Sequence, residues 1–331
     1  MLIEHLGRSI DTQHYKGYVD KKVVNEIRSN FYNENKELAI KQLKKVLNGN
    51  SKTNDIYAYY FERVANDTKL SHVRWSINEF LQSDELIHVF YQKTLNNKKV
   101  FTSNDLVKNI KTAIRLGPAG MTAKPTQFPI KTMRELLDEF TEERDLYYDP
   151  CCGWGMRMMC AAEKGLHYVG NDVNYDLLLK LKELKEDIQT IKPFKANLIY
   201  EGSQVFQPSL VNRVDFVFTS PPYFDLEVYN GSEGLKNTSY DNWLNEFIKP
   251  MLENCYQYIK SNKYAAINIK NGKKNMLYDD TLRIAEEIGF KFVGEKDLKQ
   301  SNRTTVNPER VIGDSSEKIM ILQKSGGIIN E

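Results

Sequence analysis

The sequence predicts an α/β protein, in which a mostly parallel β-sheet is covered by helices on both faces and preceded by a mainly helical region. Beyond residue 130, short apolar runs alternate with segments whose apolar residues recur at helical spacing. Before residue 115 the apolar spacing is helical throughout, with no alternating strands. The segment 115–129 between them is rich in Gly and Pro and predicts a linker or an ordered loop.

These patterns divide the chain into three parts. Residues 1–115 form the predicted helical region, 116–325 the α/β domain, and 326–331 a flexible tail. Apolar stripes in the helical region predict helices near residues 23–27, 38–47, 56–64 and 75–90, the second ending at Asn48, Gly49 and Asn50.

Strands and helices alternate along the α/β domain. Strands are expected at residues 146–148, 167–170, 198–200, 214–218, 264–269, 290–293 and 318–322. Helices are expected at residues 133–140, after the glycine turn near 155, and at 177–188, 244–259 and 282–288. We expect the long helix at 244–259 to bend at Pro250.

Composition excludes several classes of protein. The chain has 331 residues, is 41% hydrophobic and carries a net charge of only +2, which excludes a disordered protein. It has no apolar run near the roughly 20 residues that span a bilayer, and no secretory signal, so we expect a cytoplasmic location without membrane contact.

The cysteines and histidines do not predict a metal site. Cys151, Cys152, Cys160 and Cys255 form no C-x-x-C pair, and no histidines stand at zinc-ligand spacing. We therefore expect reduced, buried thiols and no metal.

The charge is distributed unevenly. Residues 1–120 contain 19 Lys and Arg against 13 Asp and Glu, whereas residues 121–331 contain 27 against 31. The near-neutral total is thus an average over a basic and an acidic part, and a nucleic-acid partner remains compatible with it.

A glycine turn and a carboxylate suggest a nucleoside-containing cofactor. Asp149, Gly153 and Gly155 follow the first strand of the sheet, and the next strand ends at Asp172. Ligands of open α/β sheets bind at the carboxyl ends of the strands, where such a carboxylate accepts hydrogen bonds from ribose hydroxyls. The G-x-G-x-x-G fingerprint is absent, which disfavours a nicotinamide oxidoreductase.

The segment from Thr219 to Tyr223 suggests chemistry on an amino group. Pro221 and Pro222 make a rigid backbone without N–H donors, so that the Ser220 hydroxyl and the carbonyls of Ser220 and Pro221 offer acceptors. Such acceptors bind the N–H groups of a nucleobase amine and expose its lone pair, while Tyr223 can stack on the base.

At this point the chain resembles the amino-methylating DNA methyltransferases, which methylate the exocyclic nitrogen of cytosine or adenine with S-adenosylmethionine. The resemblance covers about residues 120–325. It implies a Rossmann-like S-adenosylmethionine-dependent methyltransferase fold, and double-stranded DNA as the partner, with the target base flipped into the pocket.

The resemblance also assigns residues to roles. Gln127 to Pro129 matches the upstream segment that walls the methionine end of the cofactor, residues 201–203 lie where the adenine ring binds, and Cys151 stands where Phe is common. The implied cofactor residues are Phe128, Pro129, Asp149, Cys151, Gly153, Gly155, Asp172, Ser203 and Thr219, and the implied catalytic residues are Ser220, Pro221, Pro222 and Tyr223.

Several alternatives stay open. Ser-Pro-Pro-Tyr is most typical of cytosine-N4 enzymes, so cytosine stands before adenine N6, a base in RNA, or an inactive nucleic-acid-binding protein with the same fold. The target could be recognised by the basic N-terminal region or by the loops 224–240 and 301–316, the latter with Asn302 and Arg303. Asp225 or Glu227 could move the departing proton, although a solvated loop acid is the favoured interpretation of both. A restriction–modification, orphan or phage setting and the oligomeric state are left open.

Overall fold

The chain folds into two compact units. The computed structural model describes residues 21–32, 34–70, 75–88, 127–224, 227–228, 238–272, 275–298 and 317–326. Unit 1 comprises Met1–Asn33 and Asn66–Pro125, and unit 2 comprises Glu34–Ala65 and Thr126–Glu331.

The described part of unit 1 is mainly helical, as the apolar spacing predicts. Its α1 is connected to α5 by Arg28, whose Nε donates to the Leu81 carbonyl at 2.6 Å and whose Nη2 donates to the Gln82 carbonyl at 2.9 Å. The same guanidinium pairs with Asp84 at 2.6 Å. The elements of this unit are α1 (Lys21–Ser29), β1 (Lys69–Leu70) and α5 (Ile77–Gln82), and residues 84–88 are also helical.

Unit 2 is built on a seven-stranded sheet with the order β4-β3-β2-β5-β7-β9-β8. Strands β2 to β7 of this sheet pair in parallel, whereas β9 is antiparallel to both of its neighbours. This confirms the predicted, mostly parallel α/β sheet. The strands are β2 (Leu146–Asp149), β3 (His167–Asp172), β4 (Lys195–Tyr200), β5 (Val214–Thr219), β7 (Ile259–Ile269), β8 (Phe290–Asp297) and β9 (Lys318–Lys324), and β6 (Glu227–Val228) lies outside this sheet.

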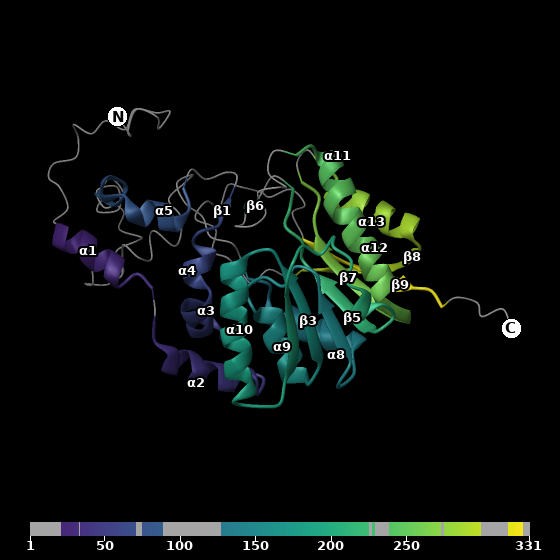
Figure 1. Ribbon diagram of the computed structural model, residues 1–331, viewed down its shortest axis with the longest axis horizontal. Coiled ribbons are helices and arrows are strands. Elements are labelled where there is room, and N and C mark those ends of the chain that lie inside the picture. The colour runs from purple at the N-terminus through teal and green to yellow at the C-terminus, as the bar shows by residue number, and fades with distance from the viewer. Residues whose placement is uncertain are drawn as a thin grey trace. The chain divides into compact units, whose positions relative to one another are not determined.

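Helices cover both faces of the sheet (Figure 1). Successive residues of a strand point to opposite faces, so Tyr147 and Phe216 pack into one apolar core and Tyr148 and Val217 into the other. The first core includes α8 (Ile130–Phe140), α9 (Met156–Lys164) and α10 (Tyr175–Gln189), and the second includes α11 (Tyr240–Trp243), α12 (Lys249–Tyr258) and α13 (Leu277–Ile288).

The long helix expected at residues 244–259 is interrupted. A π-helical turn, η5 (Leu244–Ile248), stands between α11 and α12, and Pro250 follows within the first turn of α12. Proline has no N–H and cannot continue the regular α-helical bonding to the preceding turn, which explains an irregularity there. The segment ends at Tyr258, since Ile259 already begins β7.

Residues 34–65 belong to the same unit as the sheet, whereas the sequence prediction grouped them with the other N-terminal residues. Tyr60 donates to Asp187 of α10 at 2.6 Å, and Tyr59 donates to Glu183 at 2.9 Å. Lys36 pairs with Glu183 at 3.3 Å and with Asp187 at 3.0 Å. The helices of this segment are α2 (Lys36–Val46), α3 (Asn54–Tyr60) and α4 (Glu62–Ala65).

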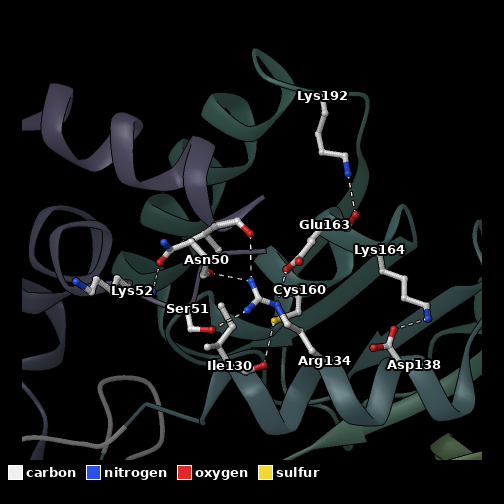
Figure 2. Close-up of polar contacts among 11 residues, drawn as sticks. Asn50, Ser51, Lys52, Ile130, Arg134, Asp138, Cys160, Glu163, Lys164 and Lys192 are labelled. Atoms are coloured by element: carbon white, nitrogen blue, oxygen red, sulfur yellow. Dashed lines mark hydrogen bonds and ion pairs between the residues drawn. The ribbon is translucent and has the colours of Figure 1, made fainter. Parts of the chain in front are cut away.

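Arg134 of α8 connects these helices to the rest of unit 2 (Figure 2). Its guanidinium donates to the Val46 carbonyl at 3.1 Å, to the Asn50 carbonyl at 2.8 Å and to Ser51 Oγ at 2.9 Å. It also pairs with Glu163 of α9 at 2.8 Å. One side chain therefore satisfies the carboxyl end of α2 and fixes it to α8 and α9.

We expect Arg134→Ala to destabilise unit 2 by about 2–3 kcal/mol, because two carbonyls and a half-buried carboxylate lose a charged donor. Urea unfolding measures the loss. Lys131→Ala on the same helix is the matched control, since its side chain is 85% exposed and its ion pair with Glu135 spans 3.9 Å. Equal losses in the two variants would show that Arg134 does not anchor α2.

Candidate functional site

The candidate site is a cavity of about 430 Å³ at the carboxyl edge of the sheet in unit 2. It is lined by the segments that follow β2, β3, β4, β5 and β8. The chain runs from β2 outward to β3 and β4 and then returns to β5 on the other side of β2, so the cavity lies at the topological switch point of the sheet. Open α/β sheets bind their ligands at this position.

The structure brings most of the sequence-predicted residues to this cavity. All four catalytic candidates, Ser220, Pro221, Pro222 and Tyr223, line it. Of the cofactor candidates, those that line it are Phe128, Pro129, Cys151, Gly153, Asp172 and Ser203.

Arg157 of α9 stabilises the turn after β2 by hydrogen bonds to two of its residues. Its Nε donates to Asp149 Oδ2 at 2.7 Å, and its Nη2 donates to the carbonyl of Cys151. Tyr168 also donates to Asp149 Oδ2, at 3.1 Å. Burial lowers the pKa of Arg157, but Asp149 raises it by more, so the guanidinium stays charged. The turn thus rests on a buried ion pair.

The carboxylate of Asp172 lies beside the same turn. Its Oδ2 accepts from the Gly153 N–H at 3.3 Å, and its Oδ1 accepts from the Asn174 N–H at 2.9 Å. Burial raises the pKa of Asp172 to about 6, although both backbone donors act in the opposite direction. The charge of this carboxylate therefore changes near pH 6, and a ligand that donates hydrogen bonds to it would favour the charged state.

Two of the catalytic candidates, Ser220 and Tyr223, belong to one hydrogen-bonded network. Asn268 of β7 donates from Nδ2 to Ser220 Oγ at 3.1 Å and to Glu317 Oε1 at 3.0 Å. Tyr223 donates its hydroxyl to the same Glu317 oxygen. The Nζ of Lys270 lies 5.8 Å from the centre of the Tyr223 ring. The Ser220 hydroxyl and the Tyr223 ring are thus fixed relative to each other by the side chains of Asn268 and Glu317.

Three predicted residues do not line the cavity. Asp149 and Thr219 are fully buried, and Asp149 contacts Arg157 and Tyr168. Gly155 has φ of +71°, and a Cβ there would lie 2.6 Å from the Phe61 ring and 2.9 Å from Leu184. The two glycines of the turn therefore have different roles, because Gly155 makes room for Phe61, whereas Gly153 faces the cavity.

Arg157, Asn268 and Glu317 are among the polar residues of the cavity that sequence reasoning missed. Arg157 is the one charge among the apolar residues that begin α9, and Asn268 interrupts an apolar strand. Both patterns indicated a buried polar group, which needs a partner. Glu317 carried no such signal. It reaches this edge because β9 is antiparallel to β7, so the residue before β9 lies at the edge where the parallel strands end.

The cysteines form no disulfide, and three of the four are buried. Burial raises the pKa of Cys151 to about 12, so a thiolate at the cavity is disfavoured. Among the described residues, no group of His, Cys, Asp and Glu side chains could hold a metal ion, and no helix is long and apolar enough to cross a membrane.

Several sequence-based candidates lie outside the described residues. They are the side chains of Asp225 and Glu227, most of the loop 224–240, and the segment 301–316 with Asn302 and Arg303. The linker predicted at residues 115–129 is described only from residue 127 onward.

The sheet order, with one antiparallel strand next to the edge, is that of the Rossmann-like fold of S-adenosylmethionine-dependent methyltransferases. The fold implied by the sequence resemblance is thereby confirmed. No protein-family model and no curated protein sequence matches this chain.

Solved structures with distant similarity include two bacterial methyltransferases and an archaeal one. A TehB-like SAM-dependent methyltransferase from Corynebacterium glutamicum is 17% identical, with 58% of this chain and 87% of that chain covered at a TM-score of 0.40. A methyltransferase from Pyrococcus furiosus is 14% identical, with 60% and 84% covered, also at 0.40. The 1,6-didemethyltoxoflavin-N1-methyltransferase from Burkholderia thailandensis is 8% identical, with 60% and 78% covered at 0.40. Similarity at this level supports no argument about activity or substrate.

We expect Gly155→Ala to destabilise unit 2 by about 3 kcal/mol, since it combines a positive φ with a clash against two fully buried side chains. Gly153→Ala is the matched control. It has φ of +54°, but its Cβ would lie 3.4 Å from Arg157 Nη2, an ordinary contact, so only about 1 kcal/mol is expected. Urea unfolding without ligand compares the two, and a loss for Gly155→Ala no larger than the control would exclude the clash with Phe61.

Proposed function

We propose that this protein is an S-adenosylmethionine-dependent DNA methyltransferase, which transfers a methyl group to the exocyclic amino nitrogen of a flipped base, with cytosine N4 as the first candidate. The observation that carries the proposal is that Ser220 to Tyr223 and Asp172 line one cavity at the switch point of the sheet. An amino-group site and a ribose site are thereby combined in one pocket.

The residues present fit this cofactor. A cavity of about 430 Å³ is large enough for a nucleoside with an amino-acid chain. Asp172 supplies a carboxylate for two ribose hydroxyls, Gly153 has φ of +54° and no side chain in the way, and Phe128 supplies an apolar wall. When bound, the cofactor would supply an electrophilic methyl group on a sulfonium.

Ser220 and Pro221 would prepare the amino group. The nitrogen of a nucleobase amine is a poor nucleophile because its lone pair is delocalised into the ring. Ser220 Oγ and the Pro221 carbonyl would each accept one N–H, which draws the nitrogen toward tetrahedral geometry and exposes the lone pair. Asn268 already donates to Ser220 Oγ, so the hydroxyl is oriented before the base arrives.

Tyr223 would hold the flipped base by stacking. Its hydroxyl is tied to Glu317, so the ring has little rotational freedom to lose on binding. Holding the base and the methyl donor in one geometry supplies most of the rate acceleration. The amino proton would be lost after transfer, and Glu317, which accepts hydrogen bonds from Tyr223 and Asn268, is a carboxylate at the site that could accept it and pass it to solvent.

Unit 1 is our candidate for holding the DNA. It contains 14 Lys and Arg against 9 Asp and Glu, whereas unit 2 contains 32 against 35. A positive surplus attracts the phosphate backbone without reading sequence. Because residues 34–65 belong to unit 2, the surplus of unit 1 lies in residues 1–33 and 66–125.

Incubation with labelled S-adenosylmethionine and double-stranded DNA, followed by analysis of the hydrolysed nucleosides, tests the proposal. N4-methylcytosine is the expected product. N6-methyladenine, or label in RNA alone, would keep the enzyme class and change the substrate. Binding of the cofactor with no transfer to DNA or RNA would support the inactive nucleic-acid-binding protein instead.

We expect Tyr223→Ala to lower methylation about 10- to 100-fold at saturating cofactor, because one base–aromatic stacking contact is lost. Cofactor affinity, measured by calorimetry, should stay unchanged. Tyr175→Ala serves as the matched control, since Tyr175 is 55% exposed and does not line the cavity. Full activity of Tyr223→Ala would exclude the stacking role.

The affinity for S-adenosylmethionine should fall as the pH drops through about 6. The pKa of Asp172 is raised to about 6, so below this value the free protein holds a neutral carboxyl that is a weaker acceptor for ribose hydroxyls. The affinity is expected to be level above pH 7 and to fall below pH 6 toward the lower affinity of the form with a neutral carboxyl. Asp172→Asn should bind weakly at every pH, and a wild-type affinity that is equal at pH 7.5 and pH 5 would remove Asp172 from the site.

A further inference from the structure

Arg157 is a buried cation of the cavity to which the sequence resemblance assigns no role. Its side chain is 6% exposed, and it is one of the residues that line the cavity. Its Nε and Nη2 are bound to Asp149 and to the Cys151 carbonyl. The remaining nitrogen, Nη1, has no hydrogen-bond partner among the described residues. A buried guanidinium with a spare donor at a cavity wall is suited to an anionic ligand group.

The charges around the cavity point to the same conclusion. Four of the described lining residues are acidic, namely Asp172, Glu201, Glu246 and Glu317. Arg157 is the single Lys or Arg among the described residues of the lining. A ligand carboxylate would be repelled at the acidic positions, so within this lining Arg157 is where it would be stabilised.

Gly153 connects this cation to the ribose position. Its N–H donates to Asp172 at 3.3 Å, and a Cβ on it would lie 3.4 Å from Arg157 Nη2. The backbone of Gly153 therefore contacts Asp172, and the space that a side chain at Gly153 would fill borders Arg157 Nη2. A ligand lying across Gly153 could present hydroxyls to Asp172 and a carboxylate to Arg157 at the same time.

We propose that Arg157 binds the α-carboxylate of the methionine part of S-adenosylmethionine. This inference rests on the proposed function, since it takes the cofactor from it. It adds a second task to Arg157, which holds Asp149 and the glycine turn through Nε and Nη2 and would hold the ligand through Nη1. The guanidinium carbon of Arg157 lies 5.7 Å from the centre of the Phe218 ring, which is fully buried and helps to exclude solvent from the guanidinium.

A pair of ligands separates this role from a purely structural one. S-adenosylmethionine and decarboxylated S-adenosylmethionine differ by the carboxylate alone, so the ratio of their dissociation constants measures what that group contributes. We expect wild-type protein to bind the complete cofactor about 10- to 100-fold more tightly than the decarboxylated form. Calorimetry measures both constants without enzymatic turnover.

Arg157→Lys is the test variant, because a lysine keeps the positive charge beside Asp149 but lacks the fork that reaches two acceptors and a ligand together. Its affinity for the complete cofactor should fall to near that for the decarboxylated form, which should itself change less than about threefold. Asp172→Asn is the comparison variant and should weaken both ligands equally, since both contain the ribose. Urea unfolding checks that each variant is folded. If Arg157→Lys does not fold, the ratio of the two dissociation constants of the wild-type protein still tests the inference.

Three results would overturn the inference. Equal wild-type affinities for the two ligands would show that the carboxylate has no favourable contact. Equal losses for both ligands in Arg157→Lys would show that Arg157 only supports the glycine turn. Wild-type protein that binds neither ligand would overturn the inference together with the proposed function, whereas the first two results leave the proposed function intact.

Discussion

The ion pair between Asp149 and Arg157 is the interaction on which the candidate site depends. It joins the last residue of β2 to the first turn of α9, and Arg157 also binds the carbonyl of Cys151 in the turn between them. Removing one partner of a buried pair typically costs about 3–5 kcal/mol, because the other charge is left without compensation. The turn that carries Gly153 is therefore held rigidly, and through the Gly153 N–H so is one oxygen of Asp172. The ion pair thus determines the geometry of the cavity floor before any ligand binds.

The order of strands and helices in unit 2 could be predicted from the sequence because β2, β3, β5 and β7 each contain a short apolar run and are each followed by a helical stripe. The runs at 214–218 and 318–322 lie inside β5 and β9, and the alternation of Tyr147 and Tyr148 between two cores shows why the runs are apolar on both faces. The grouping of residues 34–65 with the sheet could not be predicted. It depends on contacts across long chain separations, such as Tyr60 with Asp187 and Arg134 with Asn50, which leave no periodic trace in either segment. Pro250 predicted an irregular helix, but the sequence did not predict that the irregularity is a π-helical turn at Leu244–Ile248.

For the candidate site, the sequence located the cavity and part of its wall. Residues that act through short motifs, such as Asp172 and Ser220 to Tyr223, were found because motif and strand end coincide. Asn268 and Glu317 were not found, since neither belongs to a motif and Glu317 reaches the site only through the reversed direction of β9. The glycines show a second limit of motif reading: Gly153 and Gly155 share a positive φ, but only the contacts reveal that one leaves room for a ligand and the other for Phe61.

The position of Phe61 connects the N-terminal segment to the site. Its ring occupies the space that a Cβ at Gly155 would need, and Tyr60 beside it is hydrogen-bonded to α10. Residues 34–65 therefore contact the glycine turn at Gly155 through Phe61, whereas Arg157 binds the same turn at the Cys151 carbonyl. A charge count over residues 1–120 merges this supporting segment with unit 1. Once this segment is separated, unit 1 still carries 14 Lys and Arg against 9 Asp and Glu, so it keeps a basic surplus. The acidic residues that line the cavity all belong to unit 2. This division suits a protein in which one unit meets a polyanion and the other holds a cationic sulfonium and a neutral base.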